Sequence, residues 1–530
     1  MDERRVLDSW KEISAFLNRS ERTCRTWEVE LGLPVHRLEG SPKARVFAYP
    51  EELDRWHLET VSSPSREFPI AVLPLRNLST DPDQDPLADA LTEGLIAELG
   101  SVSAFRVISR RSVWRFKDST KALSEIGREL DVKAVVDGCV IRAGDRVRIS
   151  ANLYQTSPER LLWSQDFEKE IRDILDLQQE IVREVARKVQ AALTPHQSAR
   201  LYARRPVVPE AYEAYMRGEA ALRRPFVKAN IEAAVRYFEE AIGIDGGFAP
   251  AFADLGWCHA QLGFYSFTPP SEAFSRLKKA ALRAIELDPY LAKGHAVLAS
   301  AAVLGAWDWG AAERHFRRAL ELNPNSYRTN YSYMYFLCWM GRLDEMVGIL
   351  KRLLELDPID PGGVRTAGWA YFWARKYDES IAMFEELEEA APSDHWAQMA
   401  LGISYWFKGA PKESGLECGK AIAGVPVGTD TTLDAILAFV CAKSGRGEGA
   451  RETLEAWKRV SGERLIDPTL EAIVHTGLGE REEALACLEK GYADHAPMMV
   501  FLKTAAFFDE LRDEPRFREL VRRMNYPGSL

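Results

Sequence analysis

A regular spacing of prolines constrains this chain of 530 residues more than any other feature. Five prolines are separated by 35, 34, 34 and 34 residues: Pro289, Pro324, Pro358, Pro392 and Pro426. Each follows one amphipathic stretch and precedes another, and proline ends a helix because it has no backbone N–H to donate. A fixed period near 34 residues therefore predicts a solenoid of helical hairpins, in which each hairpin buries its apolar face against its neighbours.

Small and aromatic residues recur at fixed places within this period. Small residues let paired helices approach closely, and aromatic residues fill the gaps. The recurring residues include Gly368, Tyr371, Ser380, Phe384, Gly402, Tyr405, Ala421, Ala312, Phe316 and Ala319. This pattern resembles the tetratricopeptide (TPR) repeat. The resemblance covers residues 209–497 and implies about seven or eight hairpins, followed over 498–530 by an atypical helical cap.

The TPR resemblance implies that the first helix of each hairpin faces a concave groove. The residues placed there are Trp257, Arg328, Tyr331, Tyr335, Trp339, Arg365, Trp369, Phe372, Trp373, Trp396 and Trp406. Tryptophan, tyrosine and arginine are enriched at binding hot spots, so this set predicts a groove for an extended peptide or a helix of an unidentified protein partner. The alternative is that part of the set packs between helices.

The first sixty residues carry the pattern of two short helices. Ser9 and Glu12 have the spacing of a capping box, which opens a helix, and Ser20 can cap a second helix after a polar turn. Buried stripes follow on both helices, at Trp10, Ile13 and Leu17 and at Cys24, Trp27 and Leu31. Two helices joined by a short turn form a helix-turn-helix, whose second helix enters the major groove of DNA.

A strand at 45–49 and a proline-started helix at 50–56 follow, so the stretch resembles the winged helix-turn-helix of the MerR and excisionase type. The resemblance implies DNA contacts from the second helix and the wing: Ser20, Arg22, Thr23, Arg25, Thr26, Arg37, Lys43 and Arg45. It also implies a homodimer that reads two half-sites. The alternative is a degenerate helix-turn-helix used for protein contact, since residues 1–60 hold 10 basic and 12 acidic groups.

Residues 69–195 carry the order βαβαβββα, which predicts a mixed sheet with helices packed on it. Strands are predicted at 70–75, 105–109, 134–140, 146–153 and 161–167, and helices at 87–99, 122–130 and 174–193. The stretch resembles the amino-terminal domain of TolB and FlgO-like domains through its first strand at 70–75, the 87–93 helix, residues 107–110 and the 137–149 hairpin. That resemblance implies a fold and a role in assembly, and it carries over no catalytic residue.

Motifs for catalysis and cofactor binding are missing from the sequence. There is no P-loop and no His-Glu-x-x-His pair, and Pro86 stands where a calcium loop needs glycine. The seven cysteines are scattered without a Cys-x-x-Cys pair, no apolar run approaches the roughly 20 residues of a membrane span, and no secretory signal begins the chain. We therefore expect a cytoplasmic protein that is not an enzyme and has no cofactor or metal.

The sequence thus predicts a multidomain, mostly α chain. Its predicted parts are the winged helix-turn-helix at 1–60, a linker at 61–68, the α/β domain at 69–195, a linker at 196–208, the TPR array at 209–497 and the cap at 498–530. Residues 206–530 hold 37 basic and 46 acidic groups, a balance that argues against nucleic-acid binding by the array. The hypothesis is a transcriptional regulator with a DNA site and a peptide groove, and the alternative is an interaction scaffold.

Overall fold

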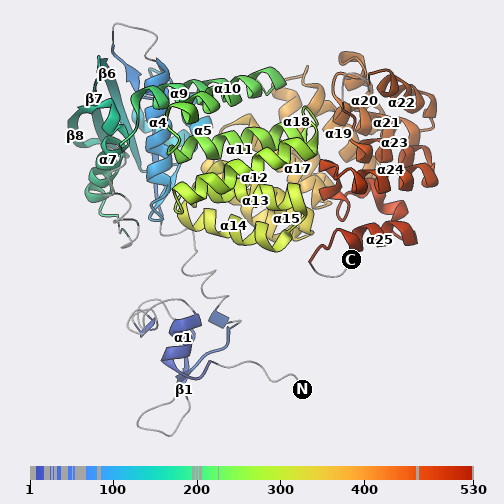
Figure 1. Ribbon diagram of the computed structural model, residues 1–530, viewed down its shortest axis with the longest axis horizontal. Coiled ribbons are helices and arrows are strands. Elements are labelled where there is room, and N and C mark those ends of the chain that lie inside the picture. The colour runs from blue at the N-terminus through green and yellow to red at the C-terminus, as the bar shows by residue number, and fades with distance from the viewer. Residues whose placement is uncertain are drawn as a thin grey trace. The chain divides into compact units, whose positions relative to one another are not determined.

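The computed structural model describes residues 7–16, 24–25, 28, 33–37, 46–50, 52–53, 67–79, 85–191, 193, 197, 201, 206–224, 226–460 and 465–527. The chain divides into two compact units, Met1–Glu67 and Phe68–Leu530, and Figure 1 labels their helices and strands. In the described part of the chain, no helix is both long enough and apolar enough to cross a membrane.

The amino-terminal unit contains a short helix and a hairpin. Helix α1 (Trp10–Phe16) begins with the predicted cap, because the Ser9 hydroxyl accepts a hydrogen bond from the Glu12 N–H at 3.2 Å. Strand β1 (His36–Arg37) pairs antiparallel with β2 (Val46–Phe47). The predicted hairpin is therefore present.

The predicted second helix of this unit lies mostly outside the described residues. Of that helix, Cys24, Arg25 and Glu28 are described, and all three are helical. The core of the unit consists of six buried side chains: Leu7, Ile13, Cys24, Leu33, Ala48 and Leu53.

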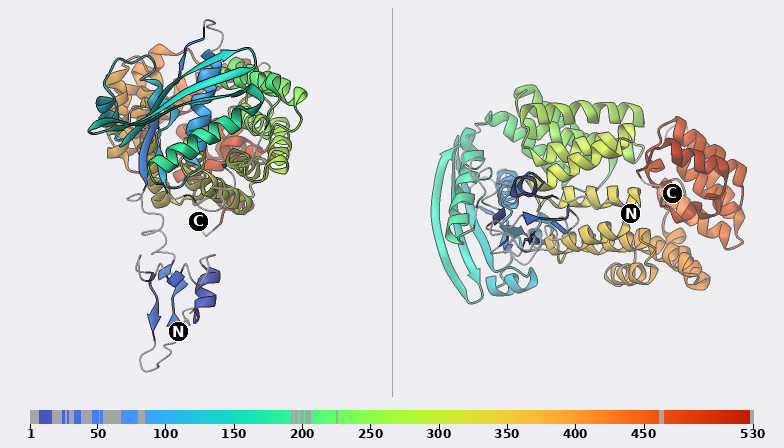
Figure 2. Two further views of the ribbon diagram at one scale, coloured as in Figure 1. Left: turned by 90° about the vertical axis from the view of Figure 1, so that its left-hand side faces the viewer. Right: turned by 90° about the horizontal axis from the view of Figure 1, so that it is seen from below.

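The second unit begins with a mixed sheet. Its strands are β3 (Phe68–Val72), β4 (Arg76–Asn77), β5 (Phe105–Val107), β6 (Ala134–Ala143), β7 (Arg146–Thr156) and β8 (Glu159–Glu170). They lie in the order β5-β3-β6-β7-β8, with β4 beside β6. Strand β3 runs parallel to β5 and β6, whereas β6, β7 and β8 are antiparallel and form the long curved strands in Figure 2. The mixed sheet was predicted. Strand β4 was missing from the prediction, because a strand of two residues is too short to show a periodic pattern.

Helices cover both faces of the sheet. Alternate side chains of β3 point to opposite faces, and their contacts show which helices cover which face. Ile70 and Val72 belong to the same buried cluster as α4 (Asp85–Gly100) and α7 (Ile174–Lys188). Ala71 and Leu73 point to the other face, which carries α5 (Arg110–Trp114) and α6 (Leu123–Glu129). Helix α5 is missing from the prediction because five residues are too few to show a helical period.

Sixteen helices, α9 to α24, then form eight successive pairs. The pairs are α9 (Pro209–Leu222) with α10 (Lys228–Ile244), α11 (Ala249–Phe264) with α12 (Pro270–Leu287), α13 (Ala292–Ala306) with α14 (Trp309–Leu322), α15 (Tyr327–Met340) with α16 (Leu343–Leu356), α17 (Pro361–Trp373) with α18 (Tyr377–Ala390), α19 (His395–Lys408) with α20 (Pro411–Gly424), α21 (Thr431–Lys443) with α22 (Gly447–Val460), and α23 (Pro468–Leu478) with α24 (Arg481–Ala493).

The periodic prolines separate these pairs, as predicted. Asn323, the residue before Pro324, is extended with φ −148° and ψ 90°, because proline disfavours the helical conformation of the residue that precedes it. Close packing inside the pairs explains the small residues: a Cβ added at Gly368 would lie 2.6 Å from the Phe384 ring, and one at Gly218 would lie 2.4 Å from Phe238. The carboxy-terminal region is therefore a TPR-like repeat array.

The chain after the last pair folds back onto the array. Helix η5 (Pro497–Phe501) contacts α11, α13 and α15 as well as α23 and α24, and it is followed by η6 (Ala506–Leu511) and α25 (Pro515–Arg523). The indole N–H of Trp309, on α14, donates a hydrogen bond to the Met524 carbonyl at 2.8 Å. The segment predicted as a cap therefore also packs against helices of earlier repeats. No local sequence pattern predicts these long-range contacts.

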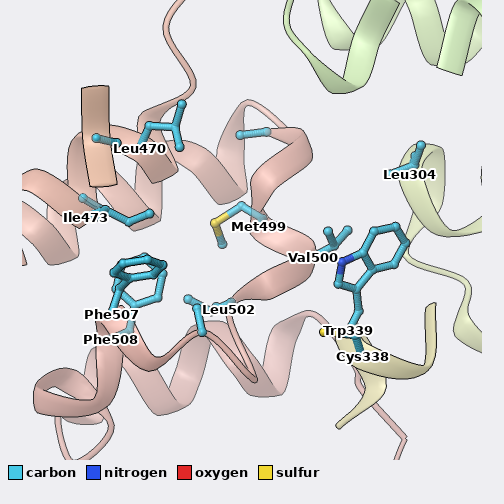
Figure 3. Packing of buried hydrophobic residues seen from close by; sticks show 14 of the residues in the cluster. Leu304, Cys338, Trp339, Leu470, Ile473, Met499, Val500, Leu502, Phe507 and Phe508 are labelled. Atoms are coloured by element: carbon cyan, nitrogen blue, oxygen red, sulfur yellow. The ribbon is translucent and has the colours of Figure 1, made fainter. Parts of the chain in front are cut away.

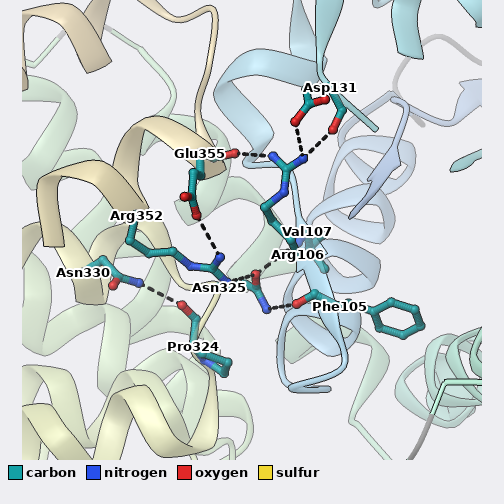
Figure 4. A network of polar contacts seen from close by, with 9 residues as sticks. All are labelled: Phe105, Arg106, Val107, Asp131, Pro324, Asn325, Asn330, Arg352 and Glu355. Atoms are coloured by element: carbon teal, nitrogen blue, oxygen red, sulfur yellow. Dashed lines mark hydrogen bonds and ion pairs between the residues drawn. The ribbon is translucent and has the colours of Figure 1, made fainter. Parts of the chain in front are cut away.

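A polar contact joins the sheet to the array within the second unit (Figure 4). The Asn325 side chain, which follows α14, accepts a hydrogen bond from the Val107 N–H at 3.0 Å and donates to the carbonyls of Gly100 and Phe105, each at 2.9 Å. The Arg106 guanidinium reaches in the opposite direction and donates to the Glu355 carbonyl at 2.9 Å. These bonds fix the edge strand β5 against the array.

Candidate functional site

A cavity of about 610 Å³ lies on the inner side of the repeat array. The first helices of seven consecutive pairs, α11 to α23, contribute side chains to its lining, and the returning segment contributes Phe501. Such a cavity falls within the range of roughly 300–1,000 Å³ that is usual for ligand sites. The cavity is therefore large enough for several side chains of a bound molecule.

Eight of the eleven predicted groove residues line this cavity: Trp257, Tyr331, Tyr335, Trp339, Arg365, Trp369, Trp373 and Trp396. The structure places the other three elsewhere. Phe372 is buried between helices against Tyr377 and Phe407, and Trp406 packs on the hydrophobic core outside the lining. The Arg328 guanidinium pairs with the Asp254 carboxylate at 2.8 Å.

The aromatic residues of the cavity lie in rows because of helix geometry. Residues four positions apart lie on one face of a helix, so Tyr331, Tyr335 and Trp339 form a row on α15, with ring centroids 5.0 Å and 6.3 Å apart. Trp369 and Trp373 form a second row on α17, 6.3 Å apart. Two aromatic rows on neighbouring repeats therefore face the same cavity.

The segment after the last helical pair, residues 497–511, packs against these aromatic rows. The Phe501 ring stacks on Trp373 at 4.7 Å and meets Trp339 edge-on at 5.8 Å. Figure 3 shows its neighbour Val500 beside the Trp339 indole. Met499, Val500 and Leu502 are fully buried, so the segment is packed into the protein core beside the cavity.

Few polar groups interrupt the aromatic lining. The Arg365 guanidinium is paired with the Asp394 carboxylate at 2.6 Å. The Asp430 carboxylate caps α21 by accepting the Thr432 N–H at 2.9 Å. The Trp339 indole N–H is buried and has no hydrogen-bond partner among the described residues.

A charged cluster borders the aromatic zone and is absent from the prediction. Asp254 is 1% exposed, and its carboxylate accepts hydrogen bonds from Lys293 at 2.5 Å, Arg328 at 2.8 Å and the Tyr215 hydroxyl at 2.9 Å. Burial alone would raise the pKa of Asp254, but the two cations outweigh burial and lower it. The 35-residue spacing of Lys293 and Arg328 matches the repeat period and is the signal that could have revealed this cluster.

Glu219, on α9, adds a second carboxyl group to the charged cluster. Burial, together with the nearby carboxylates of Asp254 and Glu93, raises its pKa to about 8, although Lys293 and Arg328 act in the opposite direction. Its Oε1 atom is buried without a hydrogen-bond partner among the described residues. A carboxyl group with this pKa is mostly protonated at neutral pH.

Two of the predicted DNA contacts are described. The Arg25 guanidinium lies 5.2 Å from the centroid of the Trp10 ring, and the Arg37 guanidinium donates a hydrogen bond to the Glu28 carboxylate at 2.9 Å. The other six lie outside the described residues: Ser20, Arg22, Thr23, Thr26, Lys43 and Arg45. The Glu28 contact partly neutralises Arg37, so a phosphate has to compete with this carboxylate.

Comparison with known proteins gives one curated relative. It is "Putative adenylate cyclase 3" of Rhizobium meliloti (strain 1021), 34% identical over 222 residues, which are 42% of this chain and 37% of that protein. The chain thus spans about 37% of the length of this relative. The match points weakly to enzyme activity and overturns the prediction that the chain is not an enzyme. No family model matches the chain.

Solved structures of TPR proteins also resemble the chain. A thermophilic TPR protein of Thermus thermophilus is 17% identical with a TM-score of 0.31, over 37% of this chain and 99% of its own. A TPR protein of Parabacteroides merdae is 12% identical with a TM-score of 0.33, over 60% of this chain and 100% of its own. Likeness at this level carries no argument about ligands.

Proposed function

We propose that this chain is an interaction protein that binds a peptide segment of a partner in the aromatic cavity. The observation that carries the proposal is the cavity itself, which gathers two aromatic rows from neighbouring repeats. Tryptophan and tyrosine are enriched among the few hot-spot residues that dominate the binding energy at protein interfaces.

The peptide proposal predicts that filling the cavity abolishes peptide selection. Ser332 lines the cavity, so Ser332→Phe places a ring inside it. Random heptapeptides displayed on phage should be enriched by the full-length protein and at least about tenfold less by the variant, as expected for one lost hot spot. Ser271→Phe, on the exposed start of α12, is the matched control and should select like the wild type. Equal enrichment by all three proteins, or none by any, would contradict peptide binding in the cavity.

We also propose that the amino-terminal unit is a winged helix-turn-helix that binds DNA as a homodimer. Helix α1, the β1–β2 hairpin and the helical conformation of Cys24, Arg25 and Glu28 support this proposal. The TolB-like identity of the sheet region, its role in assembly and the cytoplasmic location stay predictions.

The DNA proposal predicts that three arginines carry most of the affinity. The triple change of Arg22, Arg25 and Arg45 to Ala should weaken binding to a selected DNA fragment by at least about tenfold and flatten the dependence on salt, because lost phosphate contacts release fewer counterions. Fluorescence anisotropy at several salt concentrations measures both effects. A truncation that starts at Phe68 should not bind. If the triple variant binds DNA as tightly as the wild type, these arginines do not read DNA, and the alternative of an interaction scaffold is favoured.

The cyclase relative favours a second candidate function, the cyclisation of a nucleoside triphosphate. The supporting observation is the 34% identity over 222 residues. Incubation of the full-length protein with ATP and Mg²⁺, followed by mass spectrometry of cyclic AMP, tests this candidate. Product formation no faster than in a heat-denatured sample would exclude it.

A further inference from the structure

We propose that the cavity accepts a basic side chain of the partner peptide, arginine in preference to lysine. This inference rests on the proposed function, that the cavity binds a peptide, and adds which peptides it selects. Three features of the described residues carry it: the indole faces, the balance of charge inside the cavity and the charge of the array.

The tryptophans of the cavity offer electron-rich faces to a cation. Trp257, Trp369, Trp373 and Trp396 line the cavity and are only partly buried; one face of Trp373 is covered by Phe501, and the Arg328 guanidinium lies over Trp257. A cation above an indole face is attracted by the ring quadrupole, and the attraction grows when water is excluded. Guanidinium groups also stack flat on aromatic rings, which an ammonium group cannot do.

The protein already holds one guanidinium in this way at the rim of the cavity. The Arg328 guanidinium carbon lies 4.6 Å from the centroid of the Trp257 ring. Its charge is balanced by Asp254, to which it donates a hydrogen bond at 2.8 Å. A guanidinium stacked on an indole and paired with a carboxylate is therefore an arrangement that this concave face supports.

An indole face and a carboxylate are also present inside the cavity, where Arg365 is the positively charged residue of the lining. The Arg365 charge is balanced by Asp394 at 2.6 Å. Asp430 also lines the cavity, and its Oδ1 accepts the N–H groups of Thr432 and Leu433 at 2.9 Å and 3.1 Å. Within the described residues no ion pair engages Asp430, so its second oxygen is an acceptor for a guanidinium or ammonium group.

The net negative charge of the array also favours a peptide with a basic side chain. Residues 206–530 hold 37 basic and 46 acidic groups, an excess of negative charge that attracts a cationic segment and repels an acidic one. The Tyr331 and Tyr335 hydroxyls and the Ser332 hydroxyl add neutral acceptors to the lining. A neutral aromatic side chain could stack in the cavity but would leave the Asp430 carboxylate without a counter-ion.

The test compares peptides that differ only in charge. The probes are acetyl-Ala-Ala-X-Ala-Ala-amide with X as arginine, citrulline, lysine or glutamate, titrated into full-length protein whose tryptophans are labelled with ¹⁵N. Shifts of the indole N–H signals give the affinities. We expect the arginine peptide to bind about tenfold more tightly than its neutral isostere citrulline, the lysine peptide to bind between the two, and the glutamate peptide to cause no shift.

Asp430→Asn is the informative variant, because asparagine caps a helix as well as aspartate does but carries no charge. It should reduce the preference for arginine over citrulline about threefold or more. Asp308→Asn makes the same change at the cap of α14, outside the cavity, and should leave the preference unchanged.

The outcomes separate this inference from the proposed function. If arginine and citrulline peptides bind equally well, or the glutamate peptide binds best, the basic-side-chain inference is wrong and peptide binding stands. If no peptide shifts an indole signal, both are overturned.

Discussion

Replacement of Asn325 by Ala should loosen the sheet from the repeat array by about 3 kcal/mol or more. The side-chain amide serves three buried backbone groups, the N–H of Val107 and the carbonyls of Gly100 and Phe105. Alanine leaves all three unsatisfied, and each buried polar group without a partner costs about 1–3 kcal/mol. A water molecule that enters the vacated space reduces this cost, which is why we expect the lower end of the summed range.

Amide hydrogen exchange at Val107 is the direct measurement. A loss of about 3 kcal/mol corresponds to roughly 100-fold faster exchange, since each 1.4 kcal/mol is tenfold. Asn330→Ala is the matched control, because the Asn330 amide donates to the carbonyls of Pro324 and Ser326 inside the array. That variant should leave the Val107 amide as slow as in the wild type. Equal acceleration in both variants would mean that Asn325 acts on the array rather than on the contact.

The repeat array could be predicted because its information is local. Proline at every period and small residues opposite rings dictate helix ends and helix spacing within some 34 residues. The same holds for the alternation of Val147, Ile149, Ala151 and Leu153 on β7, which are all buried. Patterns of this kind depend on the periods of helices and strands, not on distant contacts.

The contacts that place the parts together could not be predicted in this way. Asn325 meets Val107 across 218 residues of chain, and Trp309 meets Met524 across 215. Such pairs need a tertiary arrangement before either residue has a role. The return of residues 497–511 across the array is of this kind, and it determines where the cavity ends.

The sequence predicts the candidate site only as well as it predicts which face of each helix points to the cavity. Spacing by four identifies Tyr331, Tyr335 and Trp339 as one row, whereas Phe372, three positions after Trp369, points between helices. One position decides whether an aromatic side chain lines the cavity or fills the core. The role of these residues in binding stays a prediction.

Raising the pH should destabilise the array through Glu219. The pKa of this carboxyl is raised from 4.5 to about 8 in the folded protein. Between these values the folded state holds a proton that the unfolded state has released, so the free energy of unfolding falls as pH rises. The stabilisation is complete below pH 4.5 and is lost once the pH passes about 8. Because the side chain is only partly buried, we expect a total loss of about 2–4 kcal/mol, less than the full shift implies.

Comparison with Glu219→Gln isolates this effect from every other titrating group. Glutamine imitates the protonated carboxyl, so urea unfolding followed by tryptophan fluorescence should give equal stabilities for the two proteins near pH 4, where Glu219 holds its proton in both the folded and the unfolded state. Near pH 8.5 the variant should be the more stable one by about 2–4 kcal/mol, since it keeps no charge beside Asp254 and Glu93. Glu239→Gln, an exposed change on the neighbouring α10, should show no such divergence. A difference between wild type and Glu219→Gln that does not change with pH would mean that Glu219 is ionised at neutral pH, and that Lys293 and Arg328 outweigh its burial.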